Sequence, residues 1–337
     1  MDITTFGKMY HGKGVVVTGA GGFIGSHLAE LLTRLGANVT AFVHYNSLGS
    51  FGWLKHSDVK NDMEVVLGDI RDPFQCNSLV QGKDLVFNLA ALIGIPYSYE
   101  APAAYFETNM KGAMNVLEAV KGRTSTRVIQ MSTSEVYGSA VTVPLGESNR
   151  LQPQSPYSAS KIASDSVALS YFHSYGTEVI VGRPFNTYGP RQSLRAIIPT
   201  IISQLLTGNR KIMLGNTDSA RDFTYVEDTC RLLCQLAVSD GCVGESVNIG
   251  TGLEIKIKDL FARISDLMCI EARIEIANER VRPPLSEVNR LVCNNRKLKN
   301  LTGESPDIDL DEGLKRTIDW FRMFSDDLAE ATPRYVV

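Results

Sequence analysis

The chain has 337 residues, a formal net charge of −3 and 44% hydrophobic residues, which describes a globular protein of roughly two lobes without a basic field for nucleic acid. No apolar run is long enough to span a membrane, and the first six residues lack the pattern of a signal peptide, so we expect a cytoplasmic protein without a membrane partner. The six cysteines and five histidines show no metal-ligand spacing, and we expect reduced thiols and no metal.

The first strong pattern is a β-branched run at 14–18 that leads into three glycines spaced three apart, Gly19, Gly22 and Gly25. An amphipathic stretch follows and reaches about residue 36. Gly19 allows a tight turn, Gly22 lets the backbone approach a pyrophosphate, and Gly25 lets the helix sit close to the strand. The pattern predicts dinucleotide binding at a helix N-terminus, rather than a glycine-rich loop without a ligand.

Strand-like and helix-like segments alternate through the first half of the chain. Strands are expected at 14–18, 39–43, 63–67, 84–89, 127–131 and 178–181, with helices near 22–36, 74–81, 103–121 and 155–175. This alternation predicts an α/β fold with a Rossmann-type, doubly wound parallel sheet. Ligands of such sheets bind beyond the carboxyl ends of the strands, where the motifs of this chain fall.

Prolines and glycines interrupt the pattern beyond Arg183, which indicates a smaller and less regular C-terminal lobe for the substrate. We therefore expect a dinucleotide-binding domain with the catalytic residues at 1–183 and a mainly substrate-binding lobe at 184–337. Segments near 224–250 are expected to return to the first domain, as a helical run at 224–237 and a strand at 246–249. A closing helix is expected at 310–324.

A phenol and an ammonium stand four residues apart in Tyr157 and Lys161, on one face of the predicted helix. A phenol with a pKa near about 10 is a poor base at neutral pH, and a neighbouring cation favours its ionised form. We therefore expect Lys161 to lower the pKa of Tyr157 and to make it a general base. The cluster Thr133, Ser134 and Glu135 just upstream strengthens this interpretation.

Together these motifs resemble the extended short-chain dehydrogenase/reductase family that modifies nucleotide sugars, over nearly the whole chain. The resemblance is carried by residues 18–25, 68–70, 88–91, 109, 132–138, 157, 161, 183–191 and 221–228. Residues 45–54 and 90–99 are similar to the subgroup of NDP-N-acetylglucosamine 4,6-dehydratases of legionaminic-acid-type pathways. The resemblance implies a lyase of cell-surface glycan biosynthesis.

The resemblance also implies site residues for a nicotinamide cofactor and for a UDP-, GDP- or dTDP-linked sugar. The implied catalytic residues are Tyr157, Lys161, Thr133, Glu135 and Ser134. The implied cofactor-binding residues are Gly19, Gly22, Phe23, Ile24, Gly25, His44, Asp69, Ile70, Leu89, Ala90, Ala91, Asn109, Tyr157, Lys161 and Pro184. The implied substrate-binding residues are Thr133, Asn186, Arg191, Arg221, Arg282 and Glu287. Of these, Asn186 and Arg221 would hold the diphosphate.

The implied reaction is a 4,6-dehydration. Tyr157 would remove the C4 hydroxyl proton while hydride leaves C4, with Thr133 bonded to the same oxygen. Glu135 would then remove the C5 proton, the C6 hydroxyl would leave as water, and hydride would return to C6. The dTDP-glucose 4,6-dehydratases usually have an Asp that protonates this hydroxyl, whereas this chain has Ser134. Either Glu135 also serves as the acid, or a water relayed by Ser134 takes part.

Three alternatives stay open. A decarboxylase of the UDP-glucuronate type shares the Thr-Ser-Glu sequence, whereas a 4-epimerase has no need of a carboxylate at Glu135. A catalytically silent nucleotide-sensing protein would not need the intact Tyr157 and Lys161. The cofactor is NAD or NADP, and NADP is slightly favoured because His44 stands where NAD-specific members usually place an acid.

The helices expected at 103–121 and 155–175 carry apolar or small residues on more than one face, among them Ala113, Val116 and Ala163. A helix that is apolar on several faces needs more than one packing partner. The family resemblance implies a homodimer that pairs these helices in a four-helix bundle.

Overall fold

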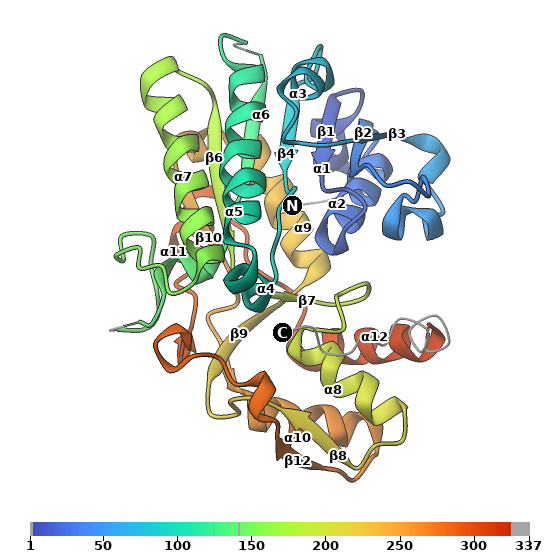
Figure 1. The fold of residues 1–337 in the computed structure, drawn as a ribbon. Coiled ribbons are helices and arrows are strands. Elements are labelled where there is room, and N and C mark those ends of the chain that lie inside the picture. The colour runs from blue at the N-terminus through green and yellow to red at the C-terminus, as the bar shows by residue number, and fades with distance from the viewer. Residues whose placement is uncertain (1–2, 124, 141, 325–337) are drawn as a thin grey trace.

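The computed structural model describes residues 3–123, 125–140 and 142–324. A body that contains the large sheet lies above a smaller lobe that is built from later parts of the chain (Figure 1). Residues 1–2, which belong to the segment compared with a signal peptide, and residues 325–337, which belong to the expected second lobe, lie outside the described residues. None of the helices within the described ranges is long and apolar enough to cross a membrane.

The body is built on a parallel seven-stranded sheet with the strand order β10-β6-β5-β4-β1-β2-β3. The strands are β1 (Gly14–Thr18), β2 (Asn38–His44), β3 (Glu64–Gly68), β4 (Leu85–Asn88), β5 (Arg127–Met131), β6 (Val179–Pro184) and β10 (Ser246–Ile249). The predicted doubly wound α/β fold is confirmed, and every predicted strand is present with small shifts at its ends. The chain runs outward from β1 to β3 and then crosses to β4, so the crevice between β1 and β4 is the expected ligand position.

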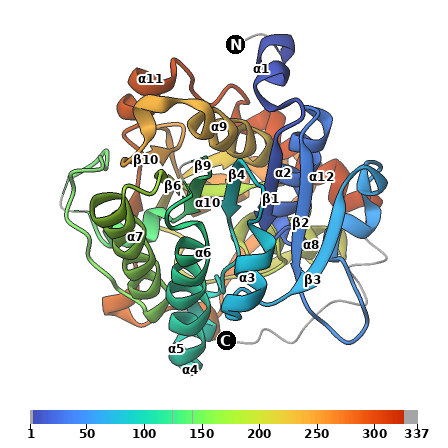
Figure 2. The ribbon, with the colours of Figure 1, turned by 90° about the horizontal axis from the view of Figure 1, so that it is seen from above.

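Helices cover both faces of the sheet (Figure 2). One face packs against α2 (Phe23–Arg34) and α9 (Val226–Val238), and the other against α3 (Pro73–Leu79), α6 (Gly112–Val120) and α7 (Pro156–Tyr175). In β1, Val15 and Val17 belong to the first core and Val16 to the second. A strand buried on both faces needs such an unbroken apolar run.

The helix expected at 103–121 is three consecutive segments. The α-helices α5 (Pro102–Tyr105) and α6 enclose a π-helical stretch at Phe106–Lys111. The short helix α4 (Ile95–Glu100) directly precedes α5. Another short helix, α1 (Ile3–Tyr10), precedes β1. Short π-helical stretches are frequent at functional sites, and this one contains Asn109.

The second lobe is more regular than expected. It contains α8 (Ile197–Leu206), α10 (Ile257–Met268) and α12 (Leu310–Met323), whereas α11 (Arg296–Thr302) packs against β10 of the body. Its strands are β7 (Asn186–Tyr188), β8 (Lys211–Leu214), β9 (Ala220–Tyr225), β11 (Glu254–Lys256), β12 (Arg273–Ile276) and β13 (Arg290–Leu291). Short 3₁₀ helices lie at Gly52–His56, Lys60–Asp62, Ser134–Tyr137, Asp240–Cys242, Asn278–Arg280 and Pro284–Ser286. Pro199, which suggested a break, is the third residue of α8, where the missing N–H costs nothing.

The segment from α9 to β10 lies in the upper body. Strand β10 pairs with β6 at the edge of the large sheet, and α9 packs beside α2. The domain boundary after residue 183 stays a prediction.

Candidate active site

The glycine-rich loop forms a tight cradle between β1 and α2. Gly19 has a φ of +69°, and a Cβ there would lie 3.0 Å from the backbone of Ala90. A Cβ on Gly25 would lie 2.2 Å from the carbonyl oxygen of Gly19. No described side chain caps the N-terminus of α2, which leaves its first N–H groups for a ligand. The cradle therefore fits the pyrophosphate of a dinucleotide.

The ends of β1 and β4 are joined by one side chain. The Thr18 hydroxyl donates to the Asn88 side chain at 2.7 Å and accepts from the N–H groups of Leu89 and Ala90, both at 3.0 Å. These bonds fix the two loops that flank the crevice at the point where the strand order reverses. The predicted cofactor residues Leu89 and Ala90 are thereby held in place.

The catalytic candidates meet where β5 and α7 approach each other. Ser155 caps α7, so Tyr157 and Lys161 occupy its first turns and are 8% and 3% exposed. Thr133 begins the short helix after β5, and its hydroxyl accepts from the N–H of Glu135 at 3.2 Å. Thr133 also forms a hydrogen bond with the Tyr157 phenol. The four side chains line the same pocket.

The expected lowering of the Tyr157 pKa is wrong for this structure. Burial raises the pKa of Tyr157 well above its ordinary value, and the Thr133 hydrogen bond only partly offsets this effect. The Lys161 ammonium donates to the carbonyl oxygen of Met131 at 2.5 Å. Burial also lowers the pKa of Lys161 to about 8, against the attraction of Asp165. For both groups, the loss of solvent on burial changes the pKa more than any neighbouring charge does.

Lys161→Met should increase thermal stability while it abolishes turnover. The drop of the Lys161 pKa from 10.5 to about 8 means that folding disfavours the charged form by about 3 kcal/mol at neutral pH. The full cost applies below pH 8 and vanishes above 10.5, so the stability gain should shrink as the pH rises between these values. Thermal melts of both proteins across this range would measure it. A Lys161→Met variant that melts at a lower temperature than the wild type at pH 7 would contradict the cost assigned to the buried Lys161 charge.

A buried ion pair supports the catalytic turn from behind. Asp165 accepts from the Ser132 hydroxyl at 2.8 Å and from Arg183 at 3.0 Å, and both charged side chains are almost fully buried. Arg183 also donates to the Tyr137 hydroxyl at 3.1 Å. This network ties the ends of β5 and β6 to α7, one turn beyond Lys161.

Two guanidinium groups from the second lobe face the other end of the pocket. Arg221 of β9 lies 3.5 Å from the carboxylate of Glu287 and is 7% exposed. Burial lowers the pKa of Arg221, the charge of Arg282 lowers it further, and Glu135 and Glu287 oppose this shift. Nη1 of Arg282 is buried and has no hydrogen-bond partner within the described ranges. Unpaired buried guanidinium N–H groups call for an anion, and a diphosphate suits them.

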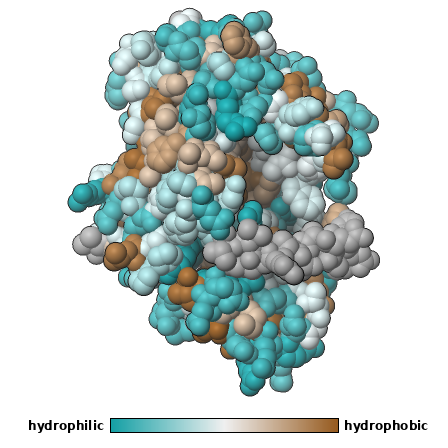
Figure 3. Space-filling model, in the orientation of Figure 1, coloured by the Kyte–Doolittle hydropathy of each residue, from teal (hydrophilic) through white to brown (hydrophobic). Residues whose placement is uncertain are grey.

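The pocket has a volume of about 1790 Å³ and runs from the glycine-rich loop to the second lobe. A pocket for one small ligand usually has about 300–1,000 Å³, so this one has room for a dinucleotide and a sugar nucleotide side by side. In Figure 3 the surface is hollowed between the body and the lower lobe. Of the predicted site residues, all except Asn109 line this pocket.

The family model described as GDP-mannose 4,6 dehydratase matches residues 16–317, almost the whole chain. The chain belongs to the GDP-mannose 4,6-dehydratase family. The predicted resemblance to extended short-chain dehydrogenase/reductases of the nucleotide-sugar 4,6-dehydratase type is thereby confirmed.

Four similar proteins show the range of this family. The dTDP-glucose 4,6-dehydratase of Streptomyces antibioticus is 33% identical over 91% of this chain and 92% of its own length. A UDP-N-acetyl-α-D-glucosaminuronate decarboxylase of Bacillus cytotoxicus is 32% identical over 94% and 99%. The UDP-N-acetylglucosamine 4-epimerase of Methanobrevibacter ruminantium has a TM-score of 0.83 at 31% identity, covering 93% and 99%. The dTDP-glucose 4,6-dehydratase of Streptomyces venezuelae, solved with NAD, has a TM-score of 0.82 at 30% identity, covering 92% and 97%.

Two predicted ligand contacts have structural partners in this member of the family. The Asn109 amide binds the backbone N–H and carbonyl of Leu92 at 2.8 and 2.9 Å and donates to the Ser160 hydroxyl at 2.9 Å. It therefore fixes the loop after β4 to α7. Arg191 reaches back to α2, where it binds Glu30 at 2.9 Å and Ser26 at 3.1 Å. The contacts of Asn109 and Arg191 with a ligand stay predictions.

Several pocket residues were not among the predicted site residues. They include Trp53 and His56 after β2, Gln192 and Arg195 after β7, and Phe324 after α12. Trp53 lies in the stretch 45–54 that carries the subgroup resemblance, and Gln192 and Arg195 lie within four residues of the stretch 183–191, so these positions could have indicated the three residues. Phe324 belongs to no motif, and only the fold brings it to the cofactor end.

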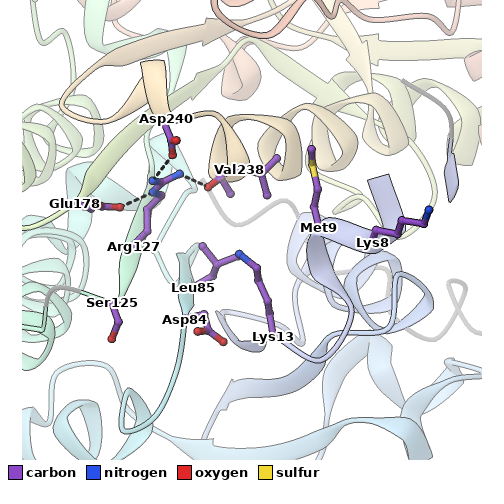
Figure 4. A pocket seen from close by; sticks show the side chains of 11 residues that line it. Lys8, Met9, Lys13, Asp84, Leu85, Ser125, Arg127, Glu178, Val238 and Asp240 are labelled. Atoms are coloured by element: carbon purple, nitrogen blue, oxygen red, sulfur yellow. Dashed lines mark hydrogen bonds and ion pairs between the residues drawn. The ribbon is translucent and has the colours of Figure 1, made fainter. Parts of the chain in front are cut away.

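A smaller cavity of about 390 Å³ lies at the amino ends of β4 and β5, opposite to the end that carries the motifs (Figure 4). Its most buried charge, Arg127, binds Glu178 at 2.8 Å, Asp240 at 2.9 Å and the carbonyl oxygen of Ala237 at 2.8 Å. The guanidinium is therefore neutralised within the protein. This arrangement joins β5 to the end of α9.

Proposed function

We propose that the protein catalyses the NAD(P)-dependent 4,6-dehydration of an NDP-hexose. The observation that carries this proposal is one pocket with Tyr157, Thr133 and Glu135 at its centre, the glycine-rich cradle at one end and Arg221 at the other. An oxidising centre next to a carboxylate suits a reaction that creates a C4 ketone and then removes the C5 proton. The dehydratase relatives support the same reaction class.

The residues of this chain have distinct tasks in the proposal. Gly19, Gly22 and Gly25 hold the pyrophosphate of the cofactor, whose nicotinamide supplies an acceptor and donor of hydride when it is bound. Tyr157 takes the proton of the C4 hydroxyl, and Thr133 bonds the same oxygen. Glu135 takes the proton from C5, which the C4 ketone has made acidic.

The acid for the C6 hydroxyl is the point at which this chain departs from the dTDP-glucose enzymes. Ser134 is 3% exposed and has no ionisation near neutral pH. Glu135 holds the C5 proton after its removal, next to the leaving hydroxyl. We therefore assign both the C5 base and the C6 acid to Glu135, since its protonated form is the donor at hand.

For the substrate we propose an NDP-N-acetylglucosamine. The similarity of residues 45–54 and 90–99 to the subgroup that acts on this sugar supports the assignment. Two relatives with about the same degree of similarity, the decarboxylase and the epimerase, are named for N-acetylated UDP sugars. Arg221 and Arg282 would hold the diphosphate, and Asn186 lies beside them in the pocket.

For the cofactor we propose NADP slightly before NAD. The end of β2 carries the exposed His44, and the nearest carboxylate that lines this end, Asp69, is paired with Arg71. Arg71 holds the pKa of Asp69 below its usual value. At this end of the pocket, His44 has no carboxylate and the carboxylate of Asp69 is paired, so neither side chain would repel a 2′-phosphate by an unpaired negative charge. NAD remains the alternative, since the Streptomyces venezuelae relative binds it.

The second candidate function is decarboxylation of a nucleotide-linked uronic acid. Two observations favour it, the Thr-Ser-Glu sequence and the charge of Arg221 near Glu135, which could attract a substrate carboxylate. The decarboxylase relative is about as similar as the dehydratases.

Mass spectra after incubation with UDP-N-acetylglucosamine, GDP-N-acetylglucosamine, dTDP-glucose and UDP-glucuronate test the proposal. Loss of one water from an N-acetylglucosamine nucleotide is the expected result. Loss of carbon dioxide from the uronic acid, without dehydration of the other sugars, would establish the second candidate. A new nucleotide sugar of unchanged mass, separated from the substrate by chromatography, would indicate an epimerase.

We propose that the protein forms a homodimer through α6 and α7. Apolar side chains gather over these helices in Figure 3, and Phe106 and Met114 are 36% and 38% exposed. Exposed apolar side chains on neighbouring helices favour a paired face. Light scattering should give twice the mass of one chain, and Met114→Arg should shift it towards one chain. The same substitution at the exposed Phe74 of α3 is the control, and a wild-type monomer at micromolar concentration would contradict the dimer.

A further inference from the structure

The two tryptophans of the chain lie against each other although one is near its beginning and the other near its end. The rings of Trp53 and Trp320 are 5.3 Å apart and meet edge to face at 74°. Phe324 stacks on Trp320 at 4.7 Å, and His56 contacts Phe324 at 5.7 Å. We call Trp53, His56, Trp320 and Phe324 the tryptophan cluster.

The first side of the cluster rests on the glycine-rich loop. The backbone N–H of Trp53 donates to the carbonyl oxygen of Gly21 at 3.0 Å. Gly52 has a φ of +59°, and a Cβ there would lie 2.2 Å from the same oxygen. Only glycine permits this approach. The segment after β2 is therefore laid directly on the loop that cradles the pyrophosphate.

The segment itself has little regular structure to hold it. A turn closed by Asn46 and Ser50 and the short 3₁₀ helix at Gly52–His56 are its ordered parts. Yet Asn46, Ser50, Trp53 and His56 all line the cofactor end of the pocket. An irregular wall of this kind needs an outside support to keep its shape.

The second side of the cluster supplies that support. Trp320 belongs to α12, whose Leu314, Ile318 and Phe321 are buried in the main core. The helix packs against α8 and β9 of the second lobe. Trp320 does not line the pocket, whereas its neighbour Phe324 does. The indole of Trp320 is thus a fixed point against which Trp53 is held.

We propose that Trp320 is a positioning residue for the dinucleotide cofactor. Through Trp53 it holds residues 46–56 on the glycine-rich loop, so that the wall of the cofactor site is formed before the cofactor arrives. A site that is ordered beforehand binds more tightly, because binding no longer bears the entropy of ordering the wall. This inference rests on the proposed nicotinamide cofactor but not on the dehydration.

The binding test uses Trp320→Ala and isothermal titration with NAD and NADP. The loss of an edge-to-face aromatic pair should raise the dissociation constant of the preferred dinucleotide about three- to tenfold. The dissociation constant of UDP should stay within about twofold, because the diphosphate residues lie at the far end. Trp320→Phe, which keeps an aromatic contact, should restore most of the affinity. Phe74→Ala, an exposed aromatic outside the pocket, is the control for surface substitution.

Fluorescence of the wild type provides a second readout that needs no variant to fold. Because the chain has two tryptophans and both belong to the cluster, indole emission reports on this contact alone. Oxidised dinucleotide should change the emission to saturation at the dissociation constant found by titration, and UDP should leave it unchanged. Excitation at the red edge of the indole band avoids the absorbance of adenine.

Unchanged dinucleotide affinity in Trp320→Ala would overturn the inference. Unchanged emission at saturating dinucleotide would overturn it as well, because a dinucleotide bound against the wall changes the surroundings of the Trp53 ring, which lines the pocket. A protein that binds dinucleotide in this way but does not dehydrate any sugar would overturn the proposed reaction and leave the inference standing. A dehydratase whose Trp320→Ala variant keeps its dinucleotide affinity would do the reverse.

Discussion

Tyr157→Phe is expected to reduce turnover by about 10²–10⁴-fold, the range that general acid–base catalysis contributes. The change removes the phenolic oxygen that bonds Thr133 and keeps the ring that packs edge to face on Tyr105 at 6.2 Å. Sugar-nucleotide binding should therefore stay nearly unchanged. Turnover numbers and calorimetric dissociation constants of the variant and the wild type would measure the two effects separately.

Tyr10→Phe is the matched control for this experiment. Tyr10 is also a buried tyrosine, and its hydroxyl donates to the carbonyl oxygen of Cys234 at 2.6 Å, away from the pocket. Loss of that bond should cost about 1 kcal/mol of stability and leave the turnover number as it is. Undiminished turnover in Tyr157→Phe would remove Tyr157 from the role of base.

Glu135→Gln is expected to stop the reaction between oxidation and elimination. An amide keeps the shape of the side chain but is too weak a base for the C5 proton. Oxidation at C4 needs Tyr157 and Thr133, which the variant retains. Absorbance of reduced nicotinamide should therefore accumulate when the variant receives the true substrate, whereas the wild type should show little at steady state.

The control is Glu275→Gln, which changes an exposed carboxylate of β12 that pairs with Lys211. It should behave as the wild type does. In heavy water the wild-type product should carry deuterium at C5, since that carbon is reprotonated after the elimination. A Glu135→Gln variant that still eliminates water would show that another group removes the C5 proton.

The sequence was sufficient to predict the large sheet and the position of the chemistry. Each strand of the first half is an apolar run, and the motifs follow β1, β4 and β5 at their carboxyl ends. The sequence was less informative about the second lobe. There Pro199 suggested an interruption, although it lies in the first turn of α8, where proline is compatible with a helix.

The site could be predicted only as far as its motifs extend. The motifs indicate Asn109 and Arg191, but only the fold shows that these side chains also bind Leu92, Ser160 and Glu30. The pKa of Tyr157 depends on burial, which no spacing of two residues reveals. Trp320 lies far from every motif, and its contact with Trp53 exists only because α12 returns to the cofactor end.

The most direct test of the 4,6-dehydration is the fate of deuterium placed at C4 of the substrate. Hydride that leaves C4 and returns to C6 of the same sugar moves the label within one molecule. We predict a product that has lost one water and carries the C4 deuterium at C6, measured by mass spectrometry and NMR of the purified nucleotide sugar. A product that retains its C6 oxygen, or a dehydrated product without deuterium at C6, would contradict the proposed reaction.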